Sequence, residues 1–161
     1  MASIRRYDPA PTGSDFREFS YRLLNTPGFL PDIYHDIERL LAKHSQAMAE
    51  CCQPMAMVDQ AGRLGGVFWV GDIEYAHQAC LYAWLWSPAC WTATTARAMA
   101  EYLTDCAASN QLDRIVCRTP DDRRLGRLLE RLGFKLEGRF SRAWKAGGRL
   151  GTLYQYRLIY A

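Results

Sequence analysis

The sequence has no large excess of charge, no long apolar run and no evident metal-binding motif. Twenty Lys and Arg residues against 17 Asp and Glu give a formal net charge of only +3, which is too small to indicate a nucleic-acid-binding protein. No apolar window of about 18 residues is free of charge, so no membrane-spanning helix is predicted. The first residues also lack the apolar run of a signal peptide. We therefore expect neither a nucleic-acid nor a membrane partner.

Cysteine and histidine are present without the spacing that would indicate a function. None of the six cysteines forms a C-x-x-C pair, and Cys51 and Cys52 are adjacent. The three histidines, His35, His44 and His77, are scattered, so no zinc site is predicted. We interpret the cysteines as reduced thiols of a cytoplasmic protein.

Length, composition and hydrophobic periodicity indicate a single α/β domain over residues 1–161. The chain is 49% hydrophobic and 23% charged, as in ordinary globular proteins. A short strand is possible near the N-terminus. Periods of 3.6 and 2 residues predict the following further elements: helices from Ser14 or Asp15 and from Pro31, strands 55–58, 64–70 and 78–86, a helix over 92–108, a strand over 112–118, a helix carrying Leu125–Leu132, and strands 135–144 and 150–160.

This order of elements predicts a mixed, mostly antiparallel sheet with helices on both faces. The strand–helix–strand unit 78–118 can form a parallel pair through a right-handed crossover. Gly71–His77 is expected to be the last turn of an antiparallel meander. Alternation places Tyr82, Trp84 and Trp86 on one face of their strand. These rings can line an acceptor pocket or simply form a core.

The segment Leu128–Gly138, which reads LLERLGFKLEG, resembles the end of the GNAT N-acetyltransferases. There a helix ends in Gly-Phe and leads into the penultimate strand. The residues agree, because Gly133 can adopt a left-handed helix-ending conformation and Phe134 can fill the core behind it. The order of elements from about residue 55 onward also matches this family, so the resemblance implies a GNAT acyl-CoA N-acyltransferase fold with a splayed parallel pair.

In that family acetyl-CoA lies between two parallel strands that splay apart. The resemblance assigns these strands to Cys80–Trp86 and Ile115–Thr119. It implies that the backbone of Leu85 and Trp86 aligns the thioester. It also implies that the start of the next helix holds the pyrophosphate, through Thr92, Ala93, Thr94, Thr95 and Ala96. Unpaired N–H groups and the positive end of the helix dipole would meet the anion there.

The sequence departs from the family pattern in this loop and in the acid. The family's loop glycines are replaced by Ala93 and Thr95, and Cys90 stands at its basic or amide position. Thr95 adds bulk where phosphate would approach, so weak acetyl-CoA binding is expected. The threonines can equally be helix-capping residues. The usual Asn and the Tyr that protonates the leaving thiolate correspond to Asp121 and Leu129, and Leu129 cannot act as an acid.

Removal of a proton from the substrate ammonium requires a base or a water relay. Glu74 is the first candidate and Asp72 the second, since both stand just before the cofactor strand, although carboxylates in a turn are often only solvated. Tyr82 is a further catalytic candidate, for which a packing role is equally open. His77 and Tyr156 are weaker candidates.

Two cysteines and a run of arginines can also be interpreted from the sequence. Cys90 and Cys117 flank the expected cleft, where a cysteine nucleophile is one hypothesis. A run of arginines is interpreted first as a solvated helix face; its members are Arg123, Arg124, Arg127 and Arg131.

The resulting hypothesis is acetyl transfer from acetyl-CoA to a primary amine of a small molecule or peptide. The alternative is a binding or regulatory module that keeps the scaffold and has lost acetyl-CoA. Transfer of another acyl group remains open, and pairing of strand edges would allow a homodimer.

Overall fold

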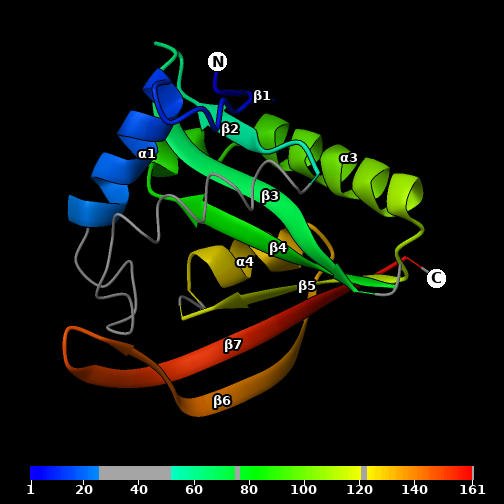
Figure 1. Ribbon diagram of the computed structural model, residues 1–161. Coiled ribbons are helices and arrows are strands. Elements are labelled where there is room, and N and C mark those ends of the chain that lie inside the picture. Colours follow the sequence, from blue (N-terminus) through cyan, green and yellow to red (C-terminus); the bar gives the residue numbers. More distant parts are fainter. Residues whose placement is uncertain (26–51, 75–76, 121–122, 161) are drawn as a thin grey trace.

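Seven strands form one mixed sheet in a computed structural model that describes residues 1–25, 52–74, 77–120 and 123–160 (Figure 1). Their order across the sheet is β1-β2-β3-β4-β5-β7-β6. The strands are β1 (Ser3–Arg6), β2 (Met55–Val58), β3 (Leu64–Glu74), β4 (Gln78–Leu85), β5 (Arg114–Thr119), β6 (Lys135–Ala146) and β7 (Arg149–Ile159). The helices are α1 (Ser14–Asn25), α3 (Ala93–Asn110) and α4 (Leu125–Arg131), with a 3₁₀ turn η1 at Pro88–Cys90.

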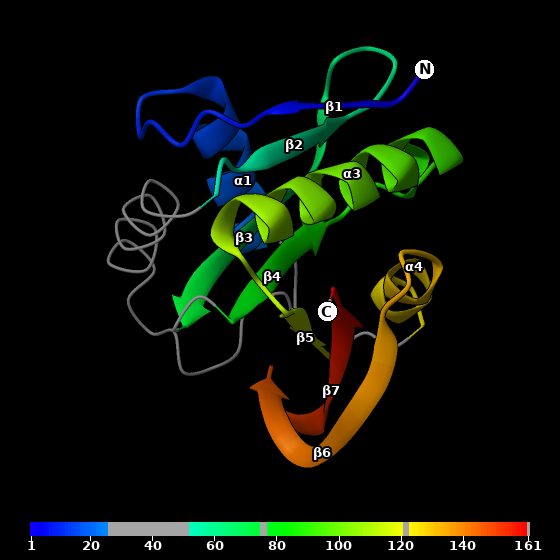
Figure 2. The ribbon, with the colours of Figure 1, turned by 90° about the vertical axis from the view of Figure 1, so that its right-hand side faces the viewer.

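The sheet separates two hydrophobic cores, one on each face. The larger core lies under α3 and α4 and includes Met99, Leu103 and Leu129. The smaller core packs α1 against β2 and β3 through Phe19 and Leu23. The two views show α1 on one side of the sheet and α4 on the other (Figure 1, Figure 2). The prediction of a mixed sheet with helices on both faces is therefore confirmed. None of the described helices is both long and apolar enough to cross a membrane.

Strand β4 presents a different set of side chains to each core. Leu81, Ala83 and Leu85 belong to the core under α3 and α4. Trp84 and Trp86 pack with the core on the α1 side. The predicted alternation is confirmed, and it means that the two faces of the sheet at β4 can differ in chemistry.

The parallel strands β4 and β5 separate after a short paired stretch. Gln78–Cys80 pairs with Arg114–Val116. The following residues of the two strands, 81–85 and 117–119, are not paired with each other. The splay predicted from the family resemblance is thus present. It opens toward the ends of the strands that precede α3 and α4.

Several predicted boundaries differ from the structure by two residues or more, and one prediction lies outside the described residues. The strand predicted over 112–118 begins at Arg114, and the strand predicted over 135–144 continues to Ala146. The turn predicted at Gly71–His77 begins later, because β3 continues to Glu74 through an irregularity at Asp72, whose φ is 48°. The helix predicted over 92–108 continues to Asn110 and is closed by Gln111 in the left-handed conformation. The helix predicted from Pro31 lies outside the described residues.

The end of α4 has the structure that the sequence predicts. Gly133 has φ +92°, a conformation in which a β-carbon is unfavourable. Phe134 follows it into the core with 2% of its surface exposed. Leu129 on α4 is fully buried in the same core, so its interpretation as a core residue is confirmed.

Candidate functional site

A cavity of about 640 Å³ lies between the start of α3 and the helix α4. Trp91, Thr92, Ala93 and Ala96 line it from the α3 side. Leu128 and Leu132 line it from α4. The polar groups of its wall are mainly arginines: Arg97, Arg123, Arg124, Arg127 and Arg131. The cavity therefore lies beside the end of β4 at which the parallel strands have separated.

The charge of this cavity is of one sign. None of the described lining residues is acidic, whereas five are arginines. Within the described ranges, Arg97, Arg127 and Arg131 form no ion pair. The prediction of a merely solvated arginine face on α4 is incomplete, because these exposed side chains also line a concave site. Unneutralised guanidinium groups in a cavity attract anions, and phosphate most of all.

The start of α3 is closed by a reciprocal capping box between two threonines. The Thr95 N–H donates to Thr92 Oγ1 at 3.2 Å, and the Thr92 N–H donates to Thr95 Oγ1 at 3.0 Å. Thr95 Oγ1 also donates to the carbonyl of Cys90 at 2.5 Å. The capping interpretation of Thr92 and Thr95 is thus confirmed.

This capping leaves two specific backbone groups available to a ligand. The first four N–H groups of a helix have no intrahelical partner, and the box uses those of Thr92 and Thr95. The N–H groups of Ala93 and Thr94 remain. Thr95 is only 1% exposed and its hydroxyl is turned inward. This orientation argues against the expectation that Thr95 adds bulk where phosphate would approach.

The edge of β4 facing the splay also has available backbone groups. The Trp86 N–H donates to the Gly65 carbonyl at 3.1 Å, which directs the backbone of Trp86 toward β3. Because hydrogen-bonding directions alternate along a strand, the N–H and carbonyl groups of Ala83 and Leu85 point toward β5, which does not pair with them. The Trp86 indole donates to the Leu64 carbonyl and stacks on Phe19. Of the two predicted thioester-aligning residues, Leu85 alone has its backbone directed to the splay.

The predicted catalytic residues lie on the opposite face, and two of them are in contact. The hydroxyl of Tyr82 donates to Asp72 Oδ2, and its ring stacks on Trp69 with centroids 5.2 Å apart. Glu74 is exposed and pairs in register with Gln78, where β4 and β5 are still joined. The register therefore favours Asp72 over Glu74 as the carboxylate nearest the splay.

A polar network on this same face was not found by sequence reasoning. The Arg118 Nε–H donates to Gln155 Oε1 at 2.7 Å, and the Gln155 amide donates to Glu137 Oε2 at 2.8 Å. Arg114 and Arg157 also pair with Glu137, at 3.0 and 3.5 Å. The hydrogen bond from Gln155, with these two positive charges, lowers the pKa of Glu137. The partners come from β5, β6 and β7, so no local pattern could reveal them.

The two cysteines expected beside the cleft are poor nucleophiles. Cys90 is fully buried, and burial raises the pKa of its thiol. Burial raises the pKa of the Cys117 thiol to about 12. A thiol needs a lowered pKa to react as a thiolate, so the geometry argues against a cysteine nucleophile.

The remaining candidates lie away from the splay or outside the description. His77 is exposed at the closed end of β4, with Nδ1 3.1 Å from Asp113 Oδ2. Tyr156 is buried beneath α4, with its hydroxyl against Gly126. Asp121 lies outside the described residues.

The sequence matches no family model and no curated protein, but the fold matches solved acetyltransferases over nearly its whole length. One is yncA, described as an acetyltransferase, from Salmonella typhimurium with acetyl-CoA (TM-score 0.72, 16% identity, 99% of this chain and 94% of that chain). A second is a mutant of spermidine N-acetyltransferase SpeG from Vibrio cholerae (0.71, 14%, 98% and 93%). A third is ribosomal-protein-S5-alanine acetyltransferase from Vibrio fischeri (0.73, 16%, 98% and 92%). At these identities the similarity shows the fold.

Proposed function

We propose that this chain, which has the fold of the GNAT acetyltransferases, is an acetyl-CoA-dependent N-acetyltransferase acting on a primary amine. One observation carries the proposal. The splay of β4 and β5 opens beside a cavity of about 640 Å³ that combines the α3 N-terminus with five arginines and no described carboxylate. A cofactor with several phosphates and an extended amide-containing arm fits this combination.

The arginines supply what the missing loop glycines would otherwise contribute. Coenzyme A carries a pyrophosphate and a separate ribose phosphate, so its binding needs several donors and positive charges. The N–H groups of Ala93 and Thr94 would receive the pyrophosphate at the helix N-terminus. Arg97, Arg127 and Arg131 would bind phosphate oxygens through charge-assisted hydrogen bonds. Ala93 and Ala96 are the small residues among those that line the cavity.

The open edge of β4 is suited to the amide arm. From Leu81 to Leu85 it is about 13 Å long, at roughly 3.3 Å per residue. The backbone groups of Ala83 and Leu85 would pair with the amides of the arm, as a neighbouring strand would. This would bring the reacting end of the arm toward Leu81 and Tyr82, so Leu85 would bind the arm and would not align the thioester itself as the family resemblance implies. The cosubstrate supplies an acetyl thioester whose carbonyl carbon is the electrophile.

The residues around Asp72 would prepare the amine for attack. An ammonium must lose a proton before its nitrogen lone pair can form the new C–N bond. Asp72 would accept that proton, directly or through water, while the Tyr82 hydroxyl holds the carboxylate in place. The C–S bond breaks as the C–N bond forms, and the thiolate takes a proton from solvent. Buried Leu129 cannot supply that proton, so we expect slower turnover than in enzymes with the family's tyrosine.

The alternative, a binding or regulatory module without acetyl-CoA, would leave this charged cavity without a role. A thiol-release assay with acetyl-CoA separates the two functions, run against a panel of small-molecule amines and peptide N-termini. The enzyme is supported if thiol release requires both the protein and an amine. Mass spectrometry should then find a product heavier than the amine by about 42 Da, which is one acetyl group in place of one hydrogen. No thiol release with any amine, together with no saturable binding of acetyl-CoA, would support the binding or regulatory module instead.

A further inference from the structure

Arg118 is held on the acceptor side of the splay with most of its hydrogen-bonding capacity unused. On β5, Ile115 and Cys117 face the core under α3 and α4, so alternation places Arg118 on the other face. It lies beyond Val116, the last β5 residue paired with β4. Its side chain is exposed. The guanidinium is therefore at the open part of the splay, on the face that carries Tyr82.

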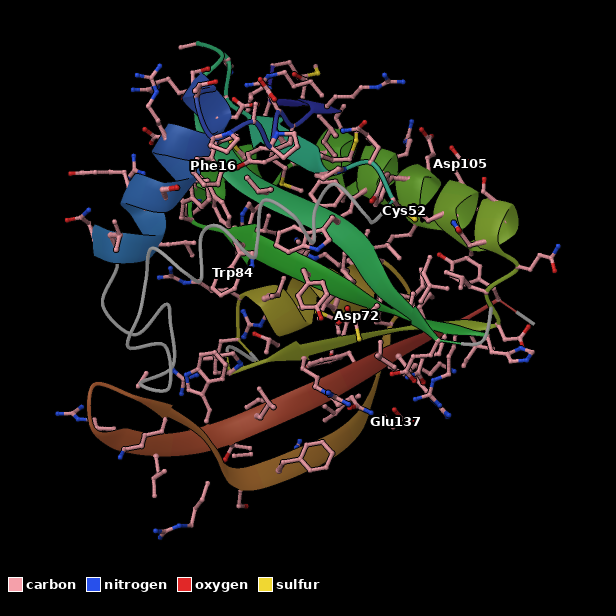
Figure 3. All side chains as sticks on the ribbon, in the orientation of Figure 1. Phe16, Cys52, Asp72, Trp84, Asp105 and Glu137 are labelled. Carbon is pink, nitrogen blue, oxygen red and sulfur yellow. The ribbon has the colours of Figure 1, made fainter. Side chains whose placement is uncertain are left out.

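The orientation of the Arg118 side chain is fixed by hydrogen bonds to neighbouring strands. Its Nε–H donates to Gln155, which in turn donates to Glu137. Glu137 is in turn held by ion pairs with Arg114 and Arg157. Figure 3 shows Glu137 below the part of the sheet that carries Asp72 and Trp84. Across the described ranges, the two terminal NH₂ groups of Arg118 have no hydrogen-bond or ion-pair partner. A pre-oriented guanidinium with both ends available is suited to bidentate binding of a carboxylate.

A carboxylate stands near this guanidinium without pairing to it. Asp72 forms no ion pair with Arg118 in the described structure, yet both lie close enough to Cys80 to affect it. Burial raises the pKa of the Cys80 thiol, Asp72 raises it further and Arg118 lowers it. Cys80 is also the last β4 residue paired with β5. A negative and a positive group thus flank the point where the strands separate.

We propose that the acceptor is an amino acid, whose ammonium binds Asp72 and whose carboxylate binds Arg118. This rests on the proposed acetyl transfer and narrows its acceptor. A simple amine would leave Arg118 without an oppositely charged partner, and a simple acid would do the same to Asp72. The half-buried rings of Tyr82 and Trp84 lie on the same strand face, so the amino acid would carry an apolar or aromatic side chain. Arg118 is then a specificity-determining residue, and Gln155 and Glu137 are positioning residues.

Matched pairs of acceptors test this directly. L-Phenylalanine and 2-phenylethylamine differ only in the carboxylate, as do L-leucine and 3-methylbutylamine. We expect kcat/KM to be roughly 10- to 100-fold higher for the amino acid of each pair, because a charge-assisted contact contributes about 1.5–3 kcal/mol. The Arg118→Gln variant should reduce that preference ratio toward 1, and Arg118→Lys should retain part of it. Arg139→Gln, which removes an exposed arginine from β6, should leave the ratio unchanged.

The outcomes separate this inference from the proposed function. A ratio near 1 in the native protein overturns the amino-acid acceptor. A ratio that Arg118→Gln does not change overturns the role of Arg118. In both cases the acetyltransferase proposal stands, provided that acetyl-CoA binds in a calorimetric titration. No binding of acetyl-CoA overturns the proposed function, and the acceptor site with it. A loss of folding in Arg118→Gln would be seen by circular dichroism, and Gln155→Met then tests the same ratio by releasing Arg118 from its anchor.

Discussion

The two faces of the sheet differ in charge at the point where β4 and β5 separate. On the α3 and α4 side, the cavity wall has five arginines and no described acidic residue. On the α1 side, Asp72 and Arg118 bring one charge of each sign. Under the two proposals, the same two strands would bind a polyanion on one face and a zwitterion on the other.

If both proposals hold, this difference in charge directs each of the two ligands to its own face of the sheet. A phosphate-bearing ligand would be attracted to Arg97, Arg127 and Arg131, which form no ion pair within the described ranges, and repelled by Asp72 on the opposite face. An ammonium group is favoured at Asp72 and disfavoured in the arginine cavity. Such charge patterns act on specificity and on encounter more than on total affinity.

The largest expected effect comes from reversing the charge of the cavity. The double change Arg127→Glu and Arg131→Glu would remove two of the proposed phosphate contacts and add repulsion. We expect acetyl-CoA affinity to fall by about 100-fold or more, at about 1.5–3 kcal/mol for each charge-assisted contact. Isothermal titration calorimetry measures this. The double change Arg139→Glu and Arg149→Glu is the matched control, since it shifts the net charge by the same amount at exposed positions of β6 and β7. An equal loss there would show a general charge effect instead of a site.

The next effect concerns the acceptor face alone. Asp72→Asn keeps the shape of the side chain and removes the proton acceptor, so the transfer rate should fall roughly 10²-fold. Acetyl-CoA affinity should stay within about twofold, because Asp72 lies on the other face. Glu74→Gln should cost much less than Asp72→Asn. The opposite ranking would restore Glu74 as the base.

The packing of α4 on the sheet can be changed without substituting any arginine. A β-carbon on Gly126 would collide with the Tyr156 hydroxyl, so Gly126→Ala should lower the free energy of unfolding by about 1–3 kcal/mol. Adding Tyr156→Phe should recover part of this loss by making room. Chemical denaturation followed by circular dichroism measures both variants. No loss in Gly126→Ala would show that α4 can shift freely on the sheet.

A smaller effect is expected at the start of α3. Thr95→Gly removes half of the capping box and places glycine in the first turn, which should cost about 1–2 kcal/mol of stability. Because Thr95 is turned inward, acetyl-CoA binding should not become tighter. Tighter binding would mean that Thr95 does obstruct the phosphate site. Thr94→Gly is the control, since Thr94 is exposed and outside the box.

The sequence predicts most elements of the fold because their signals are local. Periodicity identifies β4 and α3, and the Gly133-Phe134 pair identifies the end of α4. The extension of β3 to Glu74 is not predictable in this way, since it depends on the unusual φ of Asp72. That extension removes Asp72 and Glu74 from the predicted turn.

The candidate site is predictable only where its residues are close in sequence. The threonine cap of α3 is local, and its dual interpretation could be stated from the sequence. The arginines of α4 look like a solvated face until α3 is packed against them. The Arg118–Gln155–Glu137 network joins three strands that are distant along the chain, so it becomes visible only when the strand order is known.

The proposed binding of the acetyl-CoA phosphates in the arginine cavity can be measured directly. Calorimetric titration of the native protein with acetyl-CoA, and in parallel with acetyl-pantetheine, which keeps the thioester arm and lacks the nucleotide, tests it most directly. We predict saturable heat with acetyl-CoA at a dissociation constant below about 1 mM, equivalent to roughly −4 kcal/mol or better, and at least about tenfold weaker binding of acetyl-pantetheine. Equal binding of the two ligands, or no heat with millimolar acetyl-CoA, would contradict the account.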